Sequence, residues 1–176
     1  TTRRSILYRI KFNLHNIYKS LHTWVTIENH IIFSNINLMG MINPFVYLLF
    51  VIRFRLDANQ SLFIVLCFFL GLFIDLILGT AGAHTIATLT IGFLRPLIVG
   101  FSFGVNADIP YAMVKGTRIA NQLTYLGQII SLHSILYYTI QYFDWSAFLS
   151  IIKNALFSTI FTFILIWLIL GFYKPK

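Results

Sequence analysis

The sequence predicts an all-α integral membrane protein, a compact bundle of about six transmembrane helices. The first observation is composition: 58% of the 176 residues are hydrophobic and 10% are charged, whereas soluble domains average about 45–50% and about 25%. The second is that several apolar segments approach or exceed the roughly 20 residues that cross a hydrocarbon core. A soluble fold could not bury this much apolar surface, so we expect residues 1–176 to form a single membrane domain surrounded by lipid.

The net charge of +8 comes from 13 Lys and Arg against 5 Asp and Glu. The basic residues lie mostly beside the apolar segments, as they do in cytoplasmic loops of membrane proteins. The charge therefore indicates membrane topology, and we expect no nucleic-acid partner. The single cysteine, Cys67, lies inside an apolar run, which excludes a disulfide within the chain and a cysteine zinc site. We expect it to be a packing residue, and we expect no cofactor.

Four segments are the strongest candidates for membrane spans, namely residues 61–78, 83–101, 122–143 and 147–172. Each is long enough to cross the bilayer as an α-helix. The third is the most polar of them, because Gln128, His133 and Gln141 interrupt it. The last is long enough to span with tilt, and its Lys153 lies near one end, where its amine can reach the interface.

A fifth span is predicted at 42–56, where Asn43-Pro44 would start the helix because proline is tolerated in the first turn. It is short, and it spans only if the side chains of Arg53 and Arg55 at its end reach back to the interface.

The sixth predicted span, 16–38, follows a basic N-terminal arm at 1–15. It contains polar residues that are costly in lipid, namely Lys19, His22, Glu28 and His30, so an interfacial helix is the alternative. Six crossings with both termini in the cytoplasm would place every basic loop residue on the inner side and none outside. The charge distribution therefore favours six crossings over a re-entrant or surface-lying first segment.

Two ionisable residues lie close together in the sequence within apolar surroundings. Asp75 lies in LGLFIDLIL, and His84 follows just past a GTAGA turn. In the six-span topology both lie near the outer ends of neighbouring antiparallel helices. One interpretation is a proton relay or ligand site, because ionisable groups inside a membrane are often functional. The other is a polar contact that fixes how the two helices meet, and it is the interpretation that we prefer.

The same hairpin is rich in small residues, which let membrane helices approach closely. They are Gly71, Gly79, Ala81 and Gly82, and Gly92 in the next helix belongs with them. We therefore expect these positions to serve helix packing.

Arg95-Pro96 lies toward the inner end of segment 83–101, where proline would kink the helix and free a carbonyl. Arg95 would snorkel to the interface, and the alternatives are a lipid phosphate, a carboxylate of a partner, or Asp108 across the loop. His133 is expected to be a buried hydrogen-bonding residue and not a metal ligand.

Catalytic motifs are absent from the sequence. It contains no nucleophile elbow, no P-loop, no dinucleotide-binding fingerprint and no HExxH zinc motif. The sequence therefore does not predict an enzyme.

The segments NINLMGMINPFVYLLFVI and FFLGLFIDLILGTAGAHTIATLTIGFLRPLI resemble the MreD family of bacterial rod-shape membrane proteins, especially its Bacteroidetes-type members. The matching features are Asn43-Pro44, a Gly-Leu-x-x-Asp element with Gly71 and Asp75, a Gly-x-x-Gly-x-His turn with Gly79, Gly82 and His84, and Phe-Leu-Arg-Pro with Arg95 and Pro96. The order and spacing of these features, which cover roughly residues 35–99, make the resemblance. The rest of the chain agrees in length and hydropathy.

The resemblance implies a non-catalytic scaffold of the bacterial inner membrane that couples cytoplasmic filaments to peptidoglycan synthesis. It implies partners as well: an MreC-like protein, the actin-like MreB, the RodA glycosyltransferase and a class B penicillin-binding transpeptidase. The family is also similar to the six-helix substrate-binding subunits of energy-coupling-factor transporters, which suggests a similar helical arrangement but does not transfer their ligands to this chain. The chain departs from the family in its polar first segment. The alternative function is a small-molecule or ion transporter subunit with a polar site at Asp75 and His84.

Overall fold

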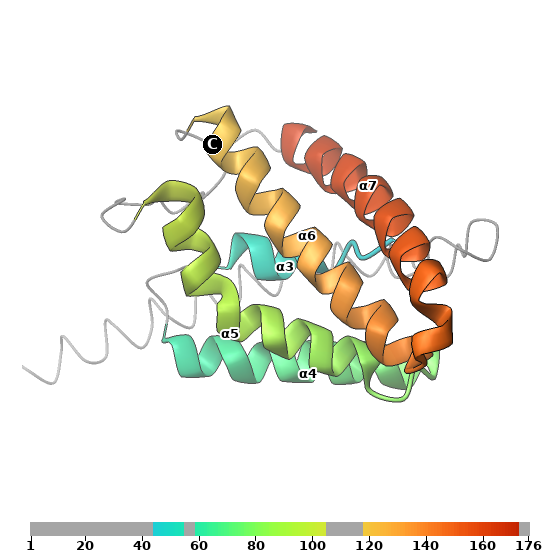
Figure 1. Ribbon diagram of the computed structural model, residues 1–176. Coiled ribbons are helices and arrows are strands. Elements are labelled where there is room, and N and C mark those ends of the chain that lie inside the picture. The colour runs from blue at the N-terminus through green and yellow to red at the C-terminus, as the bar shows by residue number, and fades with distance from the viewer. Residues whose placement is uncertain (1–43, 55–58, 105–117, 173–176) are drawn as a thin grey trace, which may run out of the picture. The chain divides into compact units, whose positions relative to one another are not determined.

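The computed structural model describes residues 44–54, 59–104 and 118–172, all within one compact unit, Asn37–Lys176. These ranges contain only helices and their connections, with no strand. The elements are α3 (Leu48–Arg53), α4 (Gln60–Leu78), α5 (Ala83–Phe103), α6 (Ile119–Tyr142), the short 3₁₀ helix η1 (Trp145–Ala147) and α7 (Phe148–Phe172), drawn in Figure 1. The predicted basic arm, 1–15, and the predicted first span, 16–38, lie outside the described residues.

Three of the described helices, α4, α5 and α7, are long and apolar enough to cross a membrane. They correspond to the predicted segments 61–78, 83–101 and 147–172, and α6 corresponds to 122–143. The 24 residues of α6 match the length of its neighbours, but its glutamines and hydroxyl side chains make it more polar. The prediction of an all-helical fold is thus confirmed for the described residues. Six membrane crossings stay a prediction.

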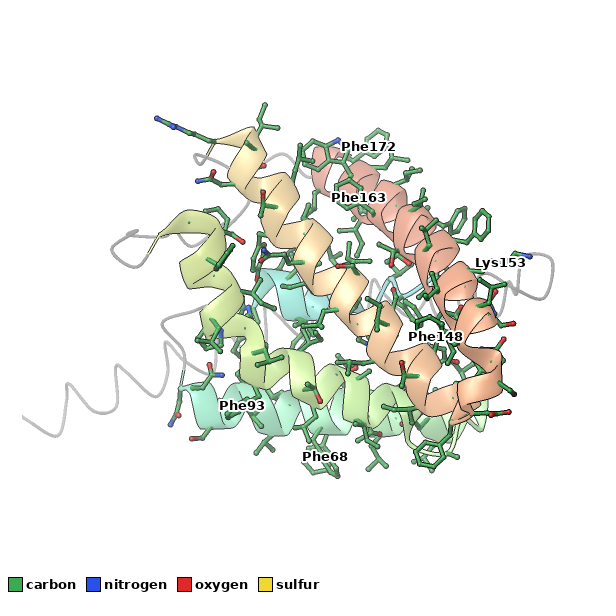
Figure 2. All side chains as sticks on the ribbon, viewed as in Figure 1. Phe68, Phe93, Phe148, Lys153, Phe163 and Phe172 are labelled. Atoms are coloured by element: carbon green, nitrogen blue, oxygen red, sulfur yellow. The ribbon has the colours of Figure 1, made fainter. Side chains whose placement is uncertain are left out.

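The outer surface of these helices is apolar, whereas the contacts between them include many polar groups. On α4, Phe69 and Leu76 are 59% and 75% exposed, while Asp75 is 6% exposed. On α7, Asn154, Ser158 and Thr162 recur every fourth residue and are all buried. Figure 2 shows Phe68 and Phe172 projecting away from the helices. Large apolar surfaces of this kind are rare on soluble proteins, so the structure indicates a membrane protein.

The predicted helix 42–56 is wrong in its start and its length. Pro44 does not begin a helix: it is followed by a turn at residues 46–47, and α3 begins at Leu48. Six helical residues rise only about 9 Å, far less than the roughly 30 Å of a hydrocarbon core.

The segment 44–54 is instead a buried element between the longer helices. Phe45, Leu48 and Val51 have almost no exposed surface, and the Phe45 backbone N–H donates to Thr162 Oγ1 on α7 at 3.1 Å. Irregular backbone at membrane depth is tolerated only where protein covers it and satisfies its polar groups. Contacts from α5, α6 and α7 provide that cover here, in place of helical hydrogen bonds.

Helix α5 bends partway along its length, as Figure 1 shows. Pro96 lies inside the helix and has no N–H to donate to the carbonyl of Gly92, four residues earlier. The side chain of Gln60 on α4 donates to that carbonyl instead, at 3.1 Å. The predicted freed carbonyl is therefore confirmed, and it joins α4 to α5.

Candidate functional site

Asp75 lies in the last turn of α4, and its carboxylate accepts four hydrogen bonds from the turn and from the first turn of α5. Oδ1 accepts from the Thr80 hydroxyl at 2.5 Å and from the His84 backbone N–H at 3.0 Å. Oδ2 accepts from the Thr85 backbone N–H at 2.7 Å and from its hydroxyl at 2.5 Å. A buried carboxylate is tolerated when its oxygens are satisfied in this way.

These bonds give α5 an N-terminal cap that its own sequence lacks. The N-cap residue is Gly82, which has no side chain to accept from the first free N–H groups. Asp75 supplies the missing acceptor from the preceding helix, and its negative charge lies at the positive end of the α5 dipole. Asp75 therefore ties the end of α4 to the start of α5.

The glycines of the α4–α5 hairpin form two groups with different structural roles. A Cβ on Gly71 would lie 2.5 Å from Thr85 Cα, and one on Gly92 would lie 2.9 Å from Cys67 Sγ, so both glycines permit α4 and α5 to approach closely, as predicted. A Cβ on Gly79 or Gly82 would meet nothing within 4 Å, but these residues have φ values of 67° and 93°. The packing role expected of these two is wrong, because their function is to let the turn adopt left-handed backbone.

His84 meets Asp75 through its backbone, while its imidazole points to a different group. His84 Nδ1 lies 2.7 Å from the Tyr47 hydroxyl, and the same hydroxyl lies 2.9 Å from Nε2 of His133. Tyr47 comes from the turn before α3, His84 from α5 and His133 from α6. The prediction of His133 as a buried hydrogen-bonding residue is confirmed.

Aromatic rings surround this His–Tyr–His chain. The Phe45 ring lies 4.8 Å from His133, and the Tyr137 ring lies 4.4 Å from His84. Two buried nitrogens, Nε2 of His84 and Nδ1 of His133, have no hydrogen-bond partner among the described residues. Within the same residues, no group of three or more His, Cys, Asp or Glu side chains could hold a metal ion.

Arg95 does not snorkel to the interface, and that prediction is wrong. Its side chain is only 2% exposed and reaches the C-terminal end of α3. Its Nε donates to the Tyr125 hydroxyl at 3.0 Å, and a terminal nitrogen donates to the carbonyls of Ile52, at 3.3 Å, and Phe54. The guanidinium also lies 4.7 Å above the Phe63 ring. Asp108, one of its predicted partners, lies outside the described residues.

The position of Arg95 follows from the short length of α3. The last carbonyls of a helix have no partner within the helix, and they attract cations. Because α3 ends inside protein, water does not reach those carbonyls freely, and a buried guanidinium with several donors can satisfy more than one. Arg95 therefore secures the end of α3 in the way that Asp75 secures the start of α5.

A further polar contact joins α6 and α7. The hydroxyls of Tyr138 and Ser158 lie 2.7 Å apart, and Asn154 donates to the Tyr142 hydroxyl at 2.7 Å. The sequence did not predict a site role for these residues, nor for Tyr47 and Tyr125. The polar residues that recur every fourth position in α7 were an available signal for its buried face. No sequence signal pairs the tyrosines with their partners.

Of the predicted site residues, Gly71, Asp75, Gly79, Gly82 and His84 meet at the α4–α5 hairpin, and Arg95 and Pro96 lie farther along α5. Pro44 is buried at the start of the segment that carries Tyr47, and Asn43 lies outside the described residues. Comparison with protein-family models, curated proteins and solved structures finds no match to this chain.

Proposed function

We propose that this chain is a non-catalytic membrane scaffold of the bacterial cell-wall elongation machinery, of the MreD type. One observation carries the proposal. The residues behind the resemblance, Gly71, Asp75, Gly79, Gly82 and His84, lie at one hairpin and hold α4 against α5. Their roles are capping, turn formation and close packing. Residues that determine helix arrangement are what a scaffold requires.

The chemistry of Asp75 agrees with this role. A general acid, a general base or a ligand-binding carboxylate needs an oxygen free to meet substrate. Both oxygens of Asp75 instead accept two hydrogen bonds each from the chain. The carboxylate therefore supports a structural role better than a reactive one.

The proposal includes a topology and partners. It places the chain in the inner membrane with six crossings, α6 among them, and with both termini in the cytoplasm, because that arrangement keeps basic loop residues inside. The partners are an MreC-like protein, MreB, RodA and a class B penicillin-binding transpeptidase, as the resemblance implies.

Depletion of the protein in its native rod-shaped host tests the proposal. We expect the cells to become round, and we expect a tagged chain purified in mild detergent to retain an MreC-like protein. Complementation with Gly71→Ala, which crowds the α4–α5 contact, should restore shape poorly. Gly100→Ala is the matched control, because a Cβ at Gly100 meets nothing within 4 Å. Normal shape after depletion, together with the absence of an MreC-like partner, would refute the proposal.

The second candidate, a transporter subunit for an ion or a small molecule, is favoured by the unpartnered Nε2 of His84 among the described residues. Asp75→Asn separates the two candidates. If the variant folds and keeps its partners but loses transport, the transporter is correct. If it loosens the hairpin and loses its partners, the scaffold is correct.

A further inference from the structure

Helix α6 differs from its neighbours in the residues that it leaves uncovered. The exposed side chains of α4 and α5 are mostly large and apolar, such as Phe69 and Leu76 on α4 and Leu97 and Phe101 on α5. Helix α6 packs against α5 on one side and against α7 on the other (Figure 1). The face that these contacts leave open, which we call the α6 outer face, carries small and polar residues at spacings of three or four. Its members, all exposed or half-buried, are Thr124, Gly127, Gln128, Ser131 and Thr139, together with the apolar Ile135.

The hydroxyl groups of this face are satisfied within the helix. Those of Thr124, Ser131 and Thr139 each donate to the backbone carbonyl four residues earlier, at 2.9, 2.6 and 2.7 Å. Serine and threonine commonly bond in this way inside helices. These three hydroxyls can therefore face lipid without a further partner, and they do not by themselves indicate one.

Gln128 is not satisfied in the same way. Its Oε1 accepts from the Ser102 hydroxyl on α5 at 3.3 Å, and no described residue accepts from its amide nitrogen. A carboxamide has two N–H donors and two acceptor lone pairs, so both donors and one lone pair remain. Gln128 is the tenth residue of α6, about 14 Å from the start of the helix at about 1.5 Å per residue. If α6 crosses the membrane, this group lies where no water satisfies it.

Gly127 provides a second, independent observation on the same face. A glycine inside a helix is destabilising relative to alanine, and a Cβ at Gly127 would meet nothing within 4 Å. Packing within the chain therefore does not require this glycine, in contrast to Gly71 and Gly92. Gly127 and Ser131 are four residues apart, a spacing of small residues that lets another membrane helix approach closely. Both observations indicate a neighbouring helix that the single chain does not supply.

The chemistry of Gln128 fits a second copy of the same chain. A carboxamide is complementary to itself, because its N–H donates to the C=O of another carboxamide while its own C=O accepts. Copies inserted with the same orientation can pair about a twofold axis normal to the membrane, which sets identical residues opposite each other at the same depth. Helix α6 contains no Asp, Glu, Lys or Arg, so two such faces meet without repulsion between charges in the helix.

We propose that the α6 outer face joins two copies of this chain into a twofold-symmetric dimer within the membrane. The carboxamide of Gln128 in each copy bonds to that of the other, and Gly127 and Ser131 lie at the centre of the contact. This inference rests on the crossing of α6 that the proposed function includes. It deepens that function, because a dimeric scaffold presents each of its other surfaces twice.

Disulfide cross-linking in native membranes tests the dimer. Oxidation with copper phenanthroline should join two copies of Ser131→Cys into a species of twice the 20.3 kDa mass of the chain, seen by non-reducing electrophoresis. Phe93→Cys places the thiol on the exposed face of α5 (Figure 2) and should stay monomeric. The wild-type chain should stay monomeric as well, because its cysteine, Cys67, is buried.

Two further substitutions in the Ser131→Cys chain test the contact itself. Gln128→Leu removes the carboxamide and should lower the cross-linked fraction several-fold. Gln141→Leu is the matched control, because it makes the same change at an exposed position in the last turn of α6 and should leave the fraction unchanged. Gly127→Leu blocks close approach, and it should fold because its Cβ meets no neighbour. Thermal unfolding of each variant in detergent checks the fold.

The absence of a cross-link in Ser131→Cys would overturn the dimer, as would full cross-linking in folded Gln128→Leu and Gly127→Leu. A cross-link to a different protein in place of a second copy would also overturn it. A membrane-impermeant maleimide, applied to both sides of the membrane, separates this failure from that of the topology. Strong labelling of Ser131→Cys would refute the crossing of α6, whereas protection without a cross-link would refute the dimer alone. Cell shape and co-purification test the scaffold separately.

Discussion

The hairpins α4–α5 and α6–α7 each use an aspartate to close the turn. The two aspartates differ in burial and in how far along the chain their hydrogen-bond partners lie. Asp144 is exposed, and it accepts from the backbone N–H and hydroxyl of Ser146 at 2.9 and 2.5 Å. Asp75 is buried, and its partners extend to the first turn of the next helix. The hydroxyl of Ser146, and then its backbone N–H, lowers the pKa of Asp144 below its ordinary value.

The comparison shows how burial changes the energetic cost of losing a hydrogen bond to a carboxylate. Water replaces the partners of an exposed carboxylate when they are removed, so an exposed contact contributes little. Water does not replace them inside the bundle, where an unpaired polar group carries its full desolvation cost. We therefore expect buried polar groups that join elements to dominate stability, and exposed groups of the same type to matter little.

Arg95 should give the largest effect. Arg95→Ala removes the donor to the Phe54 carbonyl and to the Tyr125 hydroxyl, and leaves the Ile52 carbonyl with only the Tyr125 hydroxyl at 3.4 Å. We expect a loss of about 3–5 kcal/mol in the free energy of unfolding. Arg118→Ala is the matched control, because Arg118 is exposed and should change stability by less than about 0.5 kcal/mol. Denaturant titration in detergent micelles measures both. Equal stability of the two variants would contradict the importance of burial.

Asp75→Ala should rank next. Two backbone N–H groups and two hydroxyls lose their acceptor, and we expect a loss of about 2–4 kcal/mol. Asp144→Ala removes the same side chain from the exposed turn and should lower the free energy of unfolding much less than Asp75→Ala does. The same denaturant titration compares them. A cost for Asp144→Ala that matches that of Asp75→Ala would remove the distinction between the two hairpins.

Gly71→Ala tests the closeness of α4 and α5 without changing any polar group. The new Cβ would lie 2.5 Å from backbone of Thr85, so the helices must move apart, at a cost of about 1–3 kcal/mol. Gly100→Ala meets no neighbour within 4 Å and should stabilise the helix by up to about 1 kcal/mol. Thermal unfolding should separate the variants in opposite directions. A neutral Gly71→Ala would show that the contact is looser than its geometry indicates.

The bond from Gln60 to the freed carbonyl should have a smaller, conditional effect. Gln60→Ala should cost about 1 kcal/mol, the usual value of one hydrogen bond. In a Pro96→Ala background, the new backbone N–H can bond to the Gly92 carbonyl, so Gln60→Ala should then cost almost nothing. A double-mutant cycle of unfolding free energies measures this coupling. Additive effects would mean that Pro96 is not the reason for the Gln60 contact.

The smallest effect concerns acid pH at the exposed turn. Because the folded-state pKa of Asp144 is lowered, its contribution is present above the ordinary pKa of about 3.9 and is lost as pH falls through the lower folded value. Ser146→Ala should raise this pKa toward its ordinary value. NMR titration of the Asp144 carboxyl carbon measures the shift. An unchanged pKa would mean that Ser146 is not its cause.

Hydropathy and local patterns predicted much of the fold. The apolar segments of the sequence predicted the bounds of α4, α5, α6 and α7 to within a few residues. This was possible because the formation of each helix depends on the length and composition of its own segment. Pro96 predicted a freed carbonyl, since that effect involves a residue only four positions away. Asp75 and His84 were also placed together correctly, because one short turn connects their helices.

Only the tertiary structure decided the remaining features. Helix α3 is short and buried although its sequence is as apolar as that of a span, because neighbouring helices cover it and satisfy Phe45. Arg95 is buried because the end of α3 lies beside α5, and Tyr47 meets His84 and His133 because three distant segments converge. By itself the sequence determined which segments are helical and apolar, since those properties are local. Which polar groups meet in the interior depends on how the helices pack, and no local pattern specifies it.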